Sequence, residues 1–207
     1  TLLSLLDELG ATERDVHGRV QASALYTVRH HVSELALVDR WALRLADRLR
    51  QRYPELPPPV RRFRHVLTVD VDNGFRHLGR PWLRQWGGLV RDLVCLRAAG
   101  ALQRASVLLG RRPDPFDRYA ELTALATRQP VDRVIVFLLM RGEGTYDHAV
   151  PHDPLFQKRV RSMRGAVEVG LHPSYRSSED PAIAAEDRRT LMTITGEAPR
   201  LTRQHFL

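Results

Sequence analysis

The chain has 207 residues, of which 43% are apolar and 27% are charged, and this composition is typical of a globular protein. No stretch is apolar over the length that a membrane-spanning helix needs, so the sequence predicts no membrane span. The formal net charge of +8 does not indicate a nucleic-acid partner, because Lys158 is the only lysine, the arginines are spread along the whole chain, and no motif combines basic and aromatic residues for base stacking.

The first 60 residues have a helical pattern and end in a proline-rich stretch. Apolar residues fall at helical spacing over 1–9 and again over about 33–53. The three prolines at 57–59 cannot continue a helix and favour a stiff, extended connector. We therefore interpret residues 1–60 as the helical tail of a preceding module with its linker, and residues 61–207 as a second domain.

A short apolar run that ends in two carboxylates opens the second domain. Residues 66–69, VLTV, are followed by Asp70 and Asp72 and then by the turn pair Asn73-Gly74, which predicts a buried strand ending at a turn. Side chains two positions apart in a strand point to the same side, so the carboxylates lie close together. They repel each other unless a cation, a shared proton or an arginine compensates. Taken alone, the motif is also compatible with two solvated turn residues.

Strands and helices alternate along the rest of the chain. The pattern predicts helices at 81–109, 116–127, 154–163 and 180–195, and further strands at 134–140, 166–171 and 200–206. Such alternation is typical of parallel strands joined by helical crossovers, with the carboxyl ends of all strands on one side. The expected fold class is α/β.

The helical segment 81–109 has an apolar stripe at helical spacing. We expect this stripe to be buried, and it consists of Leu89, Val90, Leu93, Leu96 and Leu102. Cys95 is the only cysteine, so it has no partner for an intramolecular disulfide, and we expect it to be a core residue.

Polar residues gather at the predicted carboxyl ends of the strands. They are Asp70 and Asp72, the loop residues Glu143, Asp147, His148 and His152, then His172, and finally Arg203 and His205. Parallel α/β folds build their sites at these ends, and carboxylates with imidazoles are the residue types of a metal-assisted hydrolase. The four loop residues are expected to be solvated unless they line a substrate groove.

Three motifs, TVDVDNG, VEVGLHPSYRS and LTRQHFL, resemble in this order those of the polysaccharide deacetylases of the NodB-homology type, which are carbohydrate esterases. The resemblance covers about residues 60–207. It implies a partial, distorted (β/α) barrel of parallel strands with covering helices, here preceded by a short helical segment. The family's remaining motifs, including its general-acid histidine, follow the third one, so we expect this chain to carry the N-terminal part of the barrel.

The resemblance also implies roles for individual residues. Asp70 matches the catalytic base, Asp72 matches the metal-binding aspartate, and His172 matches the first histidine of a His-x-x-x-His ligand pair. Arg176 stands at the position of the second histidine and cannot be a ligand, because its guanidinium stays protonated. Arg203 matches the arginine that orients the base.

A replacement for the missing histidine is required. His205 is our first candidate for the third metal ligand, and His152 and His148 are the alternatives. The cofactor is then a divalent metal, with zinc as the expected ion. Tyr175 and Ser174 are candidates for contacts with the sugar, unless they only shape the loop.

The expected function is a metal-dependent hydrolase that removes N- or O-acetyl groups from a polysaccharide or glycan precursor. The alternative is a non-catalytic relative that binds carbohydrate or acts as a scaffold, with Arg176 marking the loss of the metal. The expected partner is an N-acetylated sugar or glycan. Glycan modification fits the cytoplasm or the cell envelope, of which we favour the cytoplasm, and the oligomeric state stays open.

Overall fold

The computed structural model describes residue 10 and residues 13–128, 131–142, 146–178 and 180–204. The chain divides into two compact units, with the first extending to Phe63 and the second beginning at Arg64. The helix predicted over 1–9 lies outside the described residues. None of the helices in the described part is both long enough and apolar enough to cross a membrane.

The first unit is helical. It contains a short 3-10 helix, η2 (Ala22–Ala24), and the helices α1 (Tyr26–Arg29) and α2 (Leu37–Arg52). Helix α2 ends two residues before Pro54, because the residue that precedes a proline is sterically pushed out of the helical region. The helix predicted over about 33–53 is thus present, four residues shorter at its start.

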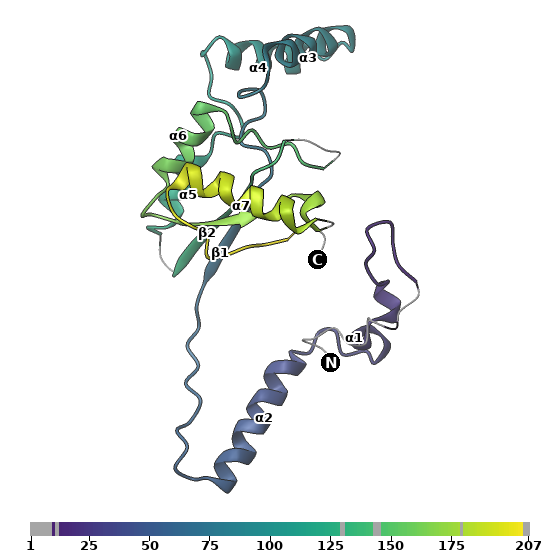
Figure 1. The fold of residues 1–207 in the computed structure, drawn as a ribbon, viewed down its shortest axis with the longest axis vertical. Helices are drawn as coiled ribbons and strands as arrows, with labels where there is room; N and C mark the ends of the chain where they lie inside the picture. Colours follow the sequence, from purple (N-terminus) through teal and green to yellow (C-terminus); the bar gives the residue numbers. More distant parts are fainter. Residues whose placement is uncertain (1–9, 11–12, 129–130, 143–145, 179, 205–207) are drawn as a thin grey trace. The chain divides into compact units, whose positions relative to one another are not determined.

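Three parallel strands form the sheet of the second unit (Figure 1). They are β1 (Val66–Val71), β2 (Arg133–Leu139) and β3 (Glu168–His172), and their order in the sheet is β1-β2-β3. The described part of the chain therefore has a mixed α/β fold with parallel strands, as predicted. The sheet is open, so it is not a closed barrel. β2 lies in the centre and six of its seven residues are buried, whereas β1 is an edge strand and is partly exposed.

A fourth full strand does not form among the described residues. In place of the strand predicted over 200–206, Thr202 makes a single parallel bridge to Leu171 of β3. Two backbone hydrogen bonds hold this segment, from Leu171 N–H to the carbonyl of Leu201 (2.9 Å) and from Arg203 N–H to the carbonyl of Leu171 (3.0 Å). They are sufficient to place Arg203 beside the sheet.

Helices follow the strands with clear sequence signals at their ends. Helices α5 (Tyr119–Leu125), α6 (Pro154–Ser162) and α7 (Pro181–Thr195) lie where helices are predicted. Both α6 and α7 begin with proline, and the preceding Asp153 and Asp180 accept hydrogen bonds from first-turn N–H groups. Gly196 ends α7 in the left-handed conformation, with φ of 78°, which a glycine adopts without a steric penalty.

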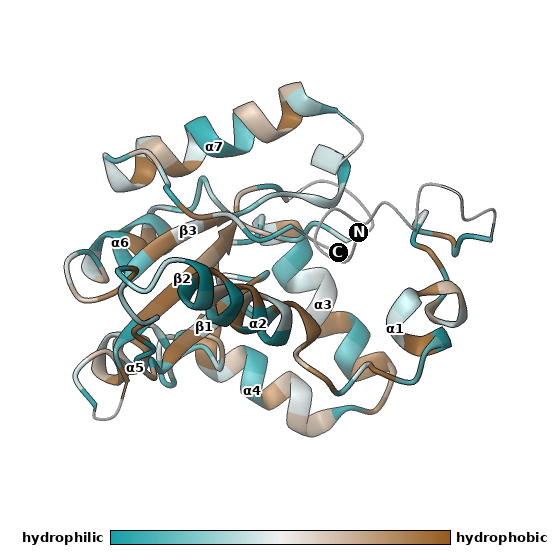
Figure 2. Cartoon of the chain, turned by 90° about the horizontal axis from the view of Figure 1, so that it is seen from below, coloured by the Kyte–Doolittle hydropathy of each residue, from teal (hydrophilic) through white to brown (hydrophobic). Residues whose placement is uncertain are grey.

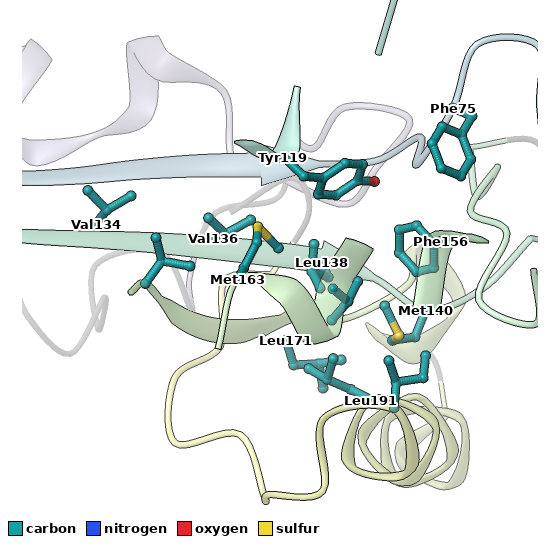
Figure 3. Packing of buried hydrophobic residues seen from close by; sticks show 13 residues of the cluster. Phe75, Tyr119, Val134, Val136, Leu138, Met140, Phe156, Met163, Leu171 and Leu191 are labelled. Atoms are coloured by element: carbon teal, nitrogen blue, oxygen red, sulfur yellow. The ribbon is translucent and has the colours of Figure 1, made fainter. Parts of the chain in front are cut away.

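One face of the sheet carries the hydrophobic core. The strands are largely hydrophobic (Figure 2), and alternate residues of β2 point into a cluster with side chains of α5, α6 and α7 (Figure 3). Its buried members include Val134, Val136, Leu138, Tyr119, Phe156 and Leu191. The ring of Tyr119 contacts those of Phe75 and Phe156 edge to face, with centroids 6.1 and 6.3 Å apart.

The opposite face of the sheet carries the polar residues of interest. The register pairs Asp70 with Phe137 and Phe137 with Gly170 across the three strands. Because side chains alternate along a strand, Thr68 shares this face with Asp70, and His172 shares it with Gly170. The candidate site is therefore built on the face that the core does not occupy.

The helical segment 81–109 folds as a hairpin of α3 (Trp82–Val94) and α4 (Ala98–Leu108), which lie side by side away from the sheet (Figure 1). The prediction that its apolar stripe is buried is wrong, since Val90, Leu93, Leu96 and Leu102 are 58–91% exposed and Leu89 is only partly buried. Cys95 is also exposed rather than in the core. The reason is that α4 packs against the other side of α3, where Asp92 binds Arg104.

Candidate active site

Asp72 and His172 meet across the end of the central strand. Asp72 directly follows β1 and His172 ends β3, and the Oδ1 atom of Asp72 lies 3.3 Å from Nε2 of His172. The imidazole is 4% exposed, whereas half of the Asp72 side chain is accessible to solvent. Two of the three residues predicted as metal ligands are therefore brought together, and Asp72 is accessible to solvent.

The backbone sets the tautomer of His172. Its Nδ1 atom lies 2.5 Å from the carbonyl oxygen of Arg203, and because a carbonyl can only accept, Nδ1 carries the proton and donates it. Nε2 is then the atom that holds either a second proton or a cation. Burial lowers the pKa of His172, but the hydrogen bond with Asp72, then the bond to the Arg203 carbonyl and the nearby carboxylate charges, outweigh burial and raise this pKa above its ordinary value.

Asp70 is held by Arg203. The NH1 group of Arg203 donates to Oδ1 of Asp70 (3.0 Å), and its NH2 group donates to the hydroxyl of Thr68 (2.8 Å). The guanidinium also lies over the ring of Phe137, with Cζ 4.9 Å from the centroid. The side chains of Asp70 and Arg203 remain 35% and 40% exposed. The guanidinium thus holds one oxygen of the Asp70 carboxylate.

Gly170 makes room for this arrangement. A Cβ atom at Gly170 would lie 2.6 Å from two ring atoms of Phe137 and 3.1 Å from the carbonyl oxygen of Leu201. Both distances are too short, so a side chain here would push against the ring beneath Arg203 and against the segment that carries Arg203. A glycine at this position on β3 lets both lie close to the sheet.

Ser174 is buried and supports the loop after β3. It is 0% exposed, and its hydroxyl (2.6 Å) and its backbone N–H (3.0 Å) both donate to Oδ2 of Asp187. The other carboxylate oxygen of Asp187 accepts from Nε of Arg141 (3.1 Å). The expected contact of Ser174 with a sugar is therefore wrong, because its side chain is enclosed and already hydrogen-bonded.

Tyr175 lies beside a second aromatic ring. The rings of Tyr175 and Tyr146 have centroids 4.8 Å apart, and Tyr146 is 43% exposed. The backbone N–H of Tyr175 donates to Oδ1 of Asp147 (3.0 Å), and Asp147 is 1% exposed. The prediction that Asp147 is a solvated loop residue is thus wrong, since its carboxylate is buried and anchors the loop of Tyr175.

The remaining candidates do not join Asp72 and His172 within the described residues. His148 and His152 line a separate pocket of about 750 Å³, whose lining includes neither of these two residues. Arg176 is exposed on the 3-10 helix η3 (Tyr175–Ser178). Glu143 and His205, the preferred third ligand, lie outside the described residues.

A shallow pocket of about 330 Å³ lies beside β1 and reaches the site. It is lined by Asp70 and Asp72 on one side and by Phe116, Tyr119 and Leu122, in and before α5, on the other. The pocket therefore lies at the edge of β1, next to the two aspartates. It combines apolar and aromatic residues with a few polar ones, which is the usual composition of a small-molecule site.

Asp72 and His172 are residue types that bind divalent ions, but two ligands do not complete a metal site. Asp72 offers a carboxylate oxygen and His172 offers Nε2, while the other ring nitrogen of His172 donates to a backbone carbonyl, as is usual for metal-bound histidines. Across the ranges that the structure describes, no group of three or more His, Cys, Asp or Glu side chains is arranged to hold a metal. A third ligand would have to come from a residue outside these ranges or from the ligand itself.

Several residues that build this site were not predicted from the sequence. Thr68 could have been predicted from strand alternation, because it lies two positions before Asp70 and its side chain therefore points to the same side. Asp187 lies four and seven positions before the buried Leu191 and Ile194, so a carboxylate on the apolar face of a helix could have marked it. Phe137 and Gly170 have no local signal, because their role depends on strand register.

Comparison of the chain with protein-family models, with curated proteins and with solved structures found no match. The residues described above and the three sequence motifs are therefore the basis on which a function can be proposed.

Proposed function

We propose that the chain contributes the site of a metal-dependent hydrolase that removes acetyl groups from an N-acetylated sugar or glycan. The observation that carries the proposal is the meeting of Asp72 and His172 across the end of β2, beside Asp70 and its arginine. One carboxylate and one imidazole suit a metal, and a second carboxylate held next to them suits a base. The sequence resemblance to polysaccharide deacetylases supports the same roles.

Asp72 and Nε2 of His172 would hold the ion. A divalent metal at this position, when bound, supplies Lewis-acid activation of a water molecule and of the acetyl carbonyl. His172 suits this role because its Nδ1–H is fixed by the Arg203 carbonyl, so Nε2 is presented to Asp72 and to the ion in one orientation. Zinc accepts both donor types.

Asp70 would act as the base. The hydrolysis of an acetamide forms a C–O bond with water and breaks the C–N bond; one proton of the water goes to Asp70 and the departing nitrogen takes up a proton. Arg203 holds Oδ1 of Asp70 and leaves the other carboxylate oxygen for the water.

The sugar would lie in the pocket beside β1. This pocket is lined by Asp70 and Asp72 and by the aromatic residues Phe116 and Tyr119. Tyr175 stays in the proposal as a further contact, because its ring and that of Tyr146 form an aromatic pair with an exposed member on the loop after β3.

A non-catalytic carbohydrate-binding protein is the second candidate. It is favoured by the arginine at position 176, because a protonated guanidinium cannot be a metal ligand. In that case Asp72 and His172 share a proton in place of a metal, and the pocket binds sugar without hydrolysing it.

Metal content and acetate release of the purified full chain test the proposal. Wild type is compared with Asp72→Ala and His172→Ala, and with Arg176→Ala as the matched control, because Arg176 lies on the same loop but is exposed. His205→Ala tests the preferred third ligand. Each variant is checked by circular dichroism and incubated with zinc before mass spectrometry, and acetate release is measured on an N-acetylated oligosaccharide.

The expected result is about one zinc per chain in wild type and in Arg176→Ala, with loss of zinc and of acetate release in Asp72→Ala and His172→Ala. Zinc retained in His205→Ala would reject His205 as a ligand without rejecting the site. A folded wild type that binds no metal but binds the oligosaccharide would establish the second candidate. A chain that binds neither contradicts both.

A further inference from the structure

The hairpin of α3 and α4 has a pocket of its own. This pocket, of about 310 Å³, shares no lining residue with the pocket beside β1. Its wall comes from the segment after β1 and from both helices, and its charged or titratable residues are Arg76, Arg91, Arg97, Arg104, His77 and Asp92. Four of the lining residues are arginines, and their like charges repel each other, which favours a bound anion. The guanidinium of Arg76 also lies over the ring of Phe116, with Cζ 6.0 Å from the ring centroid.

Asp92 forms a direct ion pair with only one of these arginines, although the charges of Arg91 and Arg97 also lower its pKa. Its Oδ2 atom accepts from Nε of Arg104 (2.9 Å), and the pair is largely buried. The hydrogen bond from Arg104 lowers the pKa of Asp92, so this carboxylate is charged at neutral pH. Within the part of the chain that the structure describes, the other three arginines of the pocket form no ion pair.

His77 is buried at the pocket without a hydrogen bond. It is 4% exposed, and neither ring nitrogen has a partner among the described residues. Gln103 interacts with the ring, but without the geometry of a hydrogen bond. Burial, and after it the charge of Arg104, lower the pKa of His77, so the ring is neutral near pH 7. A buried imidazole with both nitrogens unsatisfied is costly, and a bound polar group would satisfy it.

The first turn of α4 lies at the same pocket. Arg97 is the N-cap of α4, its side chain makes no capping hydrogen bond, and Gly100 of the first turn lines the pocket. The first N–H groups of a helix have no partner within the helix, and they favour a negative charge. The N-terminal end of α4 therefore favours a bound anion at this pocket, as the arginines and His77 do.

We propose that this pocket binds a phosphate group. Guanidinium groups bind phosphate oxygens with paired, charge-assisted hydrogen bonds, and a neutral imidazole can donate one more. The phosphate can belong to a soluble phosphorylated compound or to the head group of an anionic lipid. The second source is worth testing because residues 80–112 contain seven arginines and one acidic residue, and because Trp82 and Trp86 of α3 are 67% and 57% exposed.

Two double variants of the full chain test this site. Arg91→Gln with Arg97→Gln removes two pocket charges, and Arg111→Gln with Arg112→Gln removes the same charge from the end of the hairpin, outside the pocket lining. Binding of inorganic phosphate is measured by equilibrium dialysis. Binding to phosphatidylcholine vesicles, with and without phosphatidic acid, is measured by sedimentation. Circular dichroism and thermal melting establish that each variant is folded, and Arg97→Gln alone replaces the pocket double variant if that variant is unfolded.

We expect saturable phosphate binding by wild type, weakened about tenfold or more in the pocket variant and less than about twofold in the matched control. If binding to phosphatidic acid vesicles is weakened in the pocket variant but not in the control, and free phosphate competes with it, the phosphate belongs to a lipid head group. If only the binding of inorganic phosphate is weakened in this way, the phosphate belongs to a soluble compound. Equal weakening in both double variants, or no saturable binding of either probe, overturns the proposal.

Discussion

Nε2 of His172 lies 3.3 Å from Oδ1 of Asp72, although the strands that carry these residues are separated in the sheet by β2. Each side chain thus reaches across the end of the central strand. The two atoms are both acceptors when His172 is neutral, so a proton or a cation must lie between them for the contact to be favourable.

This contact predicts a change in the titration of His172. In the metal-free chain, Asp72→Asn removes the carboxylate that raises the pKa of His172, while burial, which lowers it, remains. The pKa of His172 should therefore fall, and NMR titration of the imidazole signals would measure it. Arg176→Ala should leave the pKa unchanged. An unchanged pKa in Asp72→Asn would mean that the two side chains do not interact in solution.

Arg203 should not be replaceable by lysine. A lysine keeps the charge, but its single ammonium group cannot reproduce the paired geometry that joins Asp70 and Thr68 over the ring of Phe137. We expect Arg203→Lys to lower kcat for acetate release by about tenfold or more, and Thr68→Val by less. Equal kcat values in wild type and Arg203→Lys would show that the arginine supplies charge alone.

Gly170→Ala should destabilise the second unit. The new Cβ would meet the buried ring of Phe137 at 2.6 Å, so the ring or the segment that carries Arg203 must move, at a cost of about 1–3 kcal/mol. The matched control is Gly87→Ala in α3, where nothing lies within 4 Å of the added Cβ and where helix propensity favours alanine. Urea unfolding of both variants measures the difference. Destabilisation of similar size in both would contradict a steric cause at Gly170.

Asp187 and Glu186 should differ greatly in their contributions to stability, although both bind Arg141. Asp187 is buried and also accepts two hydrogen bonds from Ser174, whereas the Glu186 side chain is 60% exposed. We expect Asp187→Asn to cost about 2–3 kcal/mol of unfolding free energy, and Glu186→Gln to cost clearly less, because solvent screens the exposed pair. Equal costs in chemical denaturation would show that the buried network does not hold the loop.

Asp114 should make stability depend on acid pH. Its carboxylate accepts hydrogen bonds from the backbone N–H groups of Arg76, His77, Leu78 and Phe116. Burial raises the pKa of Asp114, but these four hydrogen bonds outweigh burial, and the pKa in the folded chain lies below the ordinary value of 3.8.

The unfolded chain therefore binds a proton at Asp114 at a higher pH than the folded chain. This contribution to stability is present above pH 3.8 and is lost as the pH falls through the lower folded pKa. In Asp114→Asn, an NH2 group replaces one of the carboxylate oxygens and faces backbone N–H groups, which are also donors. This variant should lose about 2–3 kcal/mol of unfolding free energy at pH 7. Its unfolding free energy should change less than that of wild type between pH 5 and pH 3. Parallel pH profiles would contradict the assignment.

The sequence by itself determined the alternation of strands and helices as far as β3 and the side of the sheet on which the main site residues lie. Alternating strand and helix patterns predict a parallel sheet, and in such a sheet the carboxyl ends of the strands share one side, so Asp70, Asp72 and His172 lie at that side. The contact of Asp72 with His172 also depends on the order of the strands in the sheet. Local chemistry also marked the helix boundaries, because proline, a capping aspartate and a left-handed glycine act on the backbone within a few residues.

Only the tertiary structure decided which surfaces are covered. Periodicity shows that Val90 and Leu93 share a face of α3, but α4 packs on the other face, and both stay exposed. Ser174 looks accessible in sequence and is enclosed by Asp187, a residue thirteen positions away. Burial depends on which elements pack together and in what register. Such packing brings together segments that are far apart in the chain, and a local sequence pattern contains no information about it.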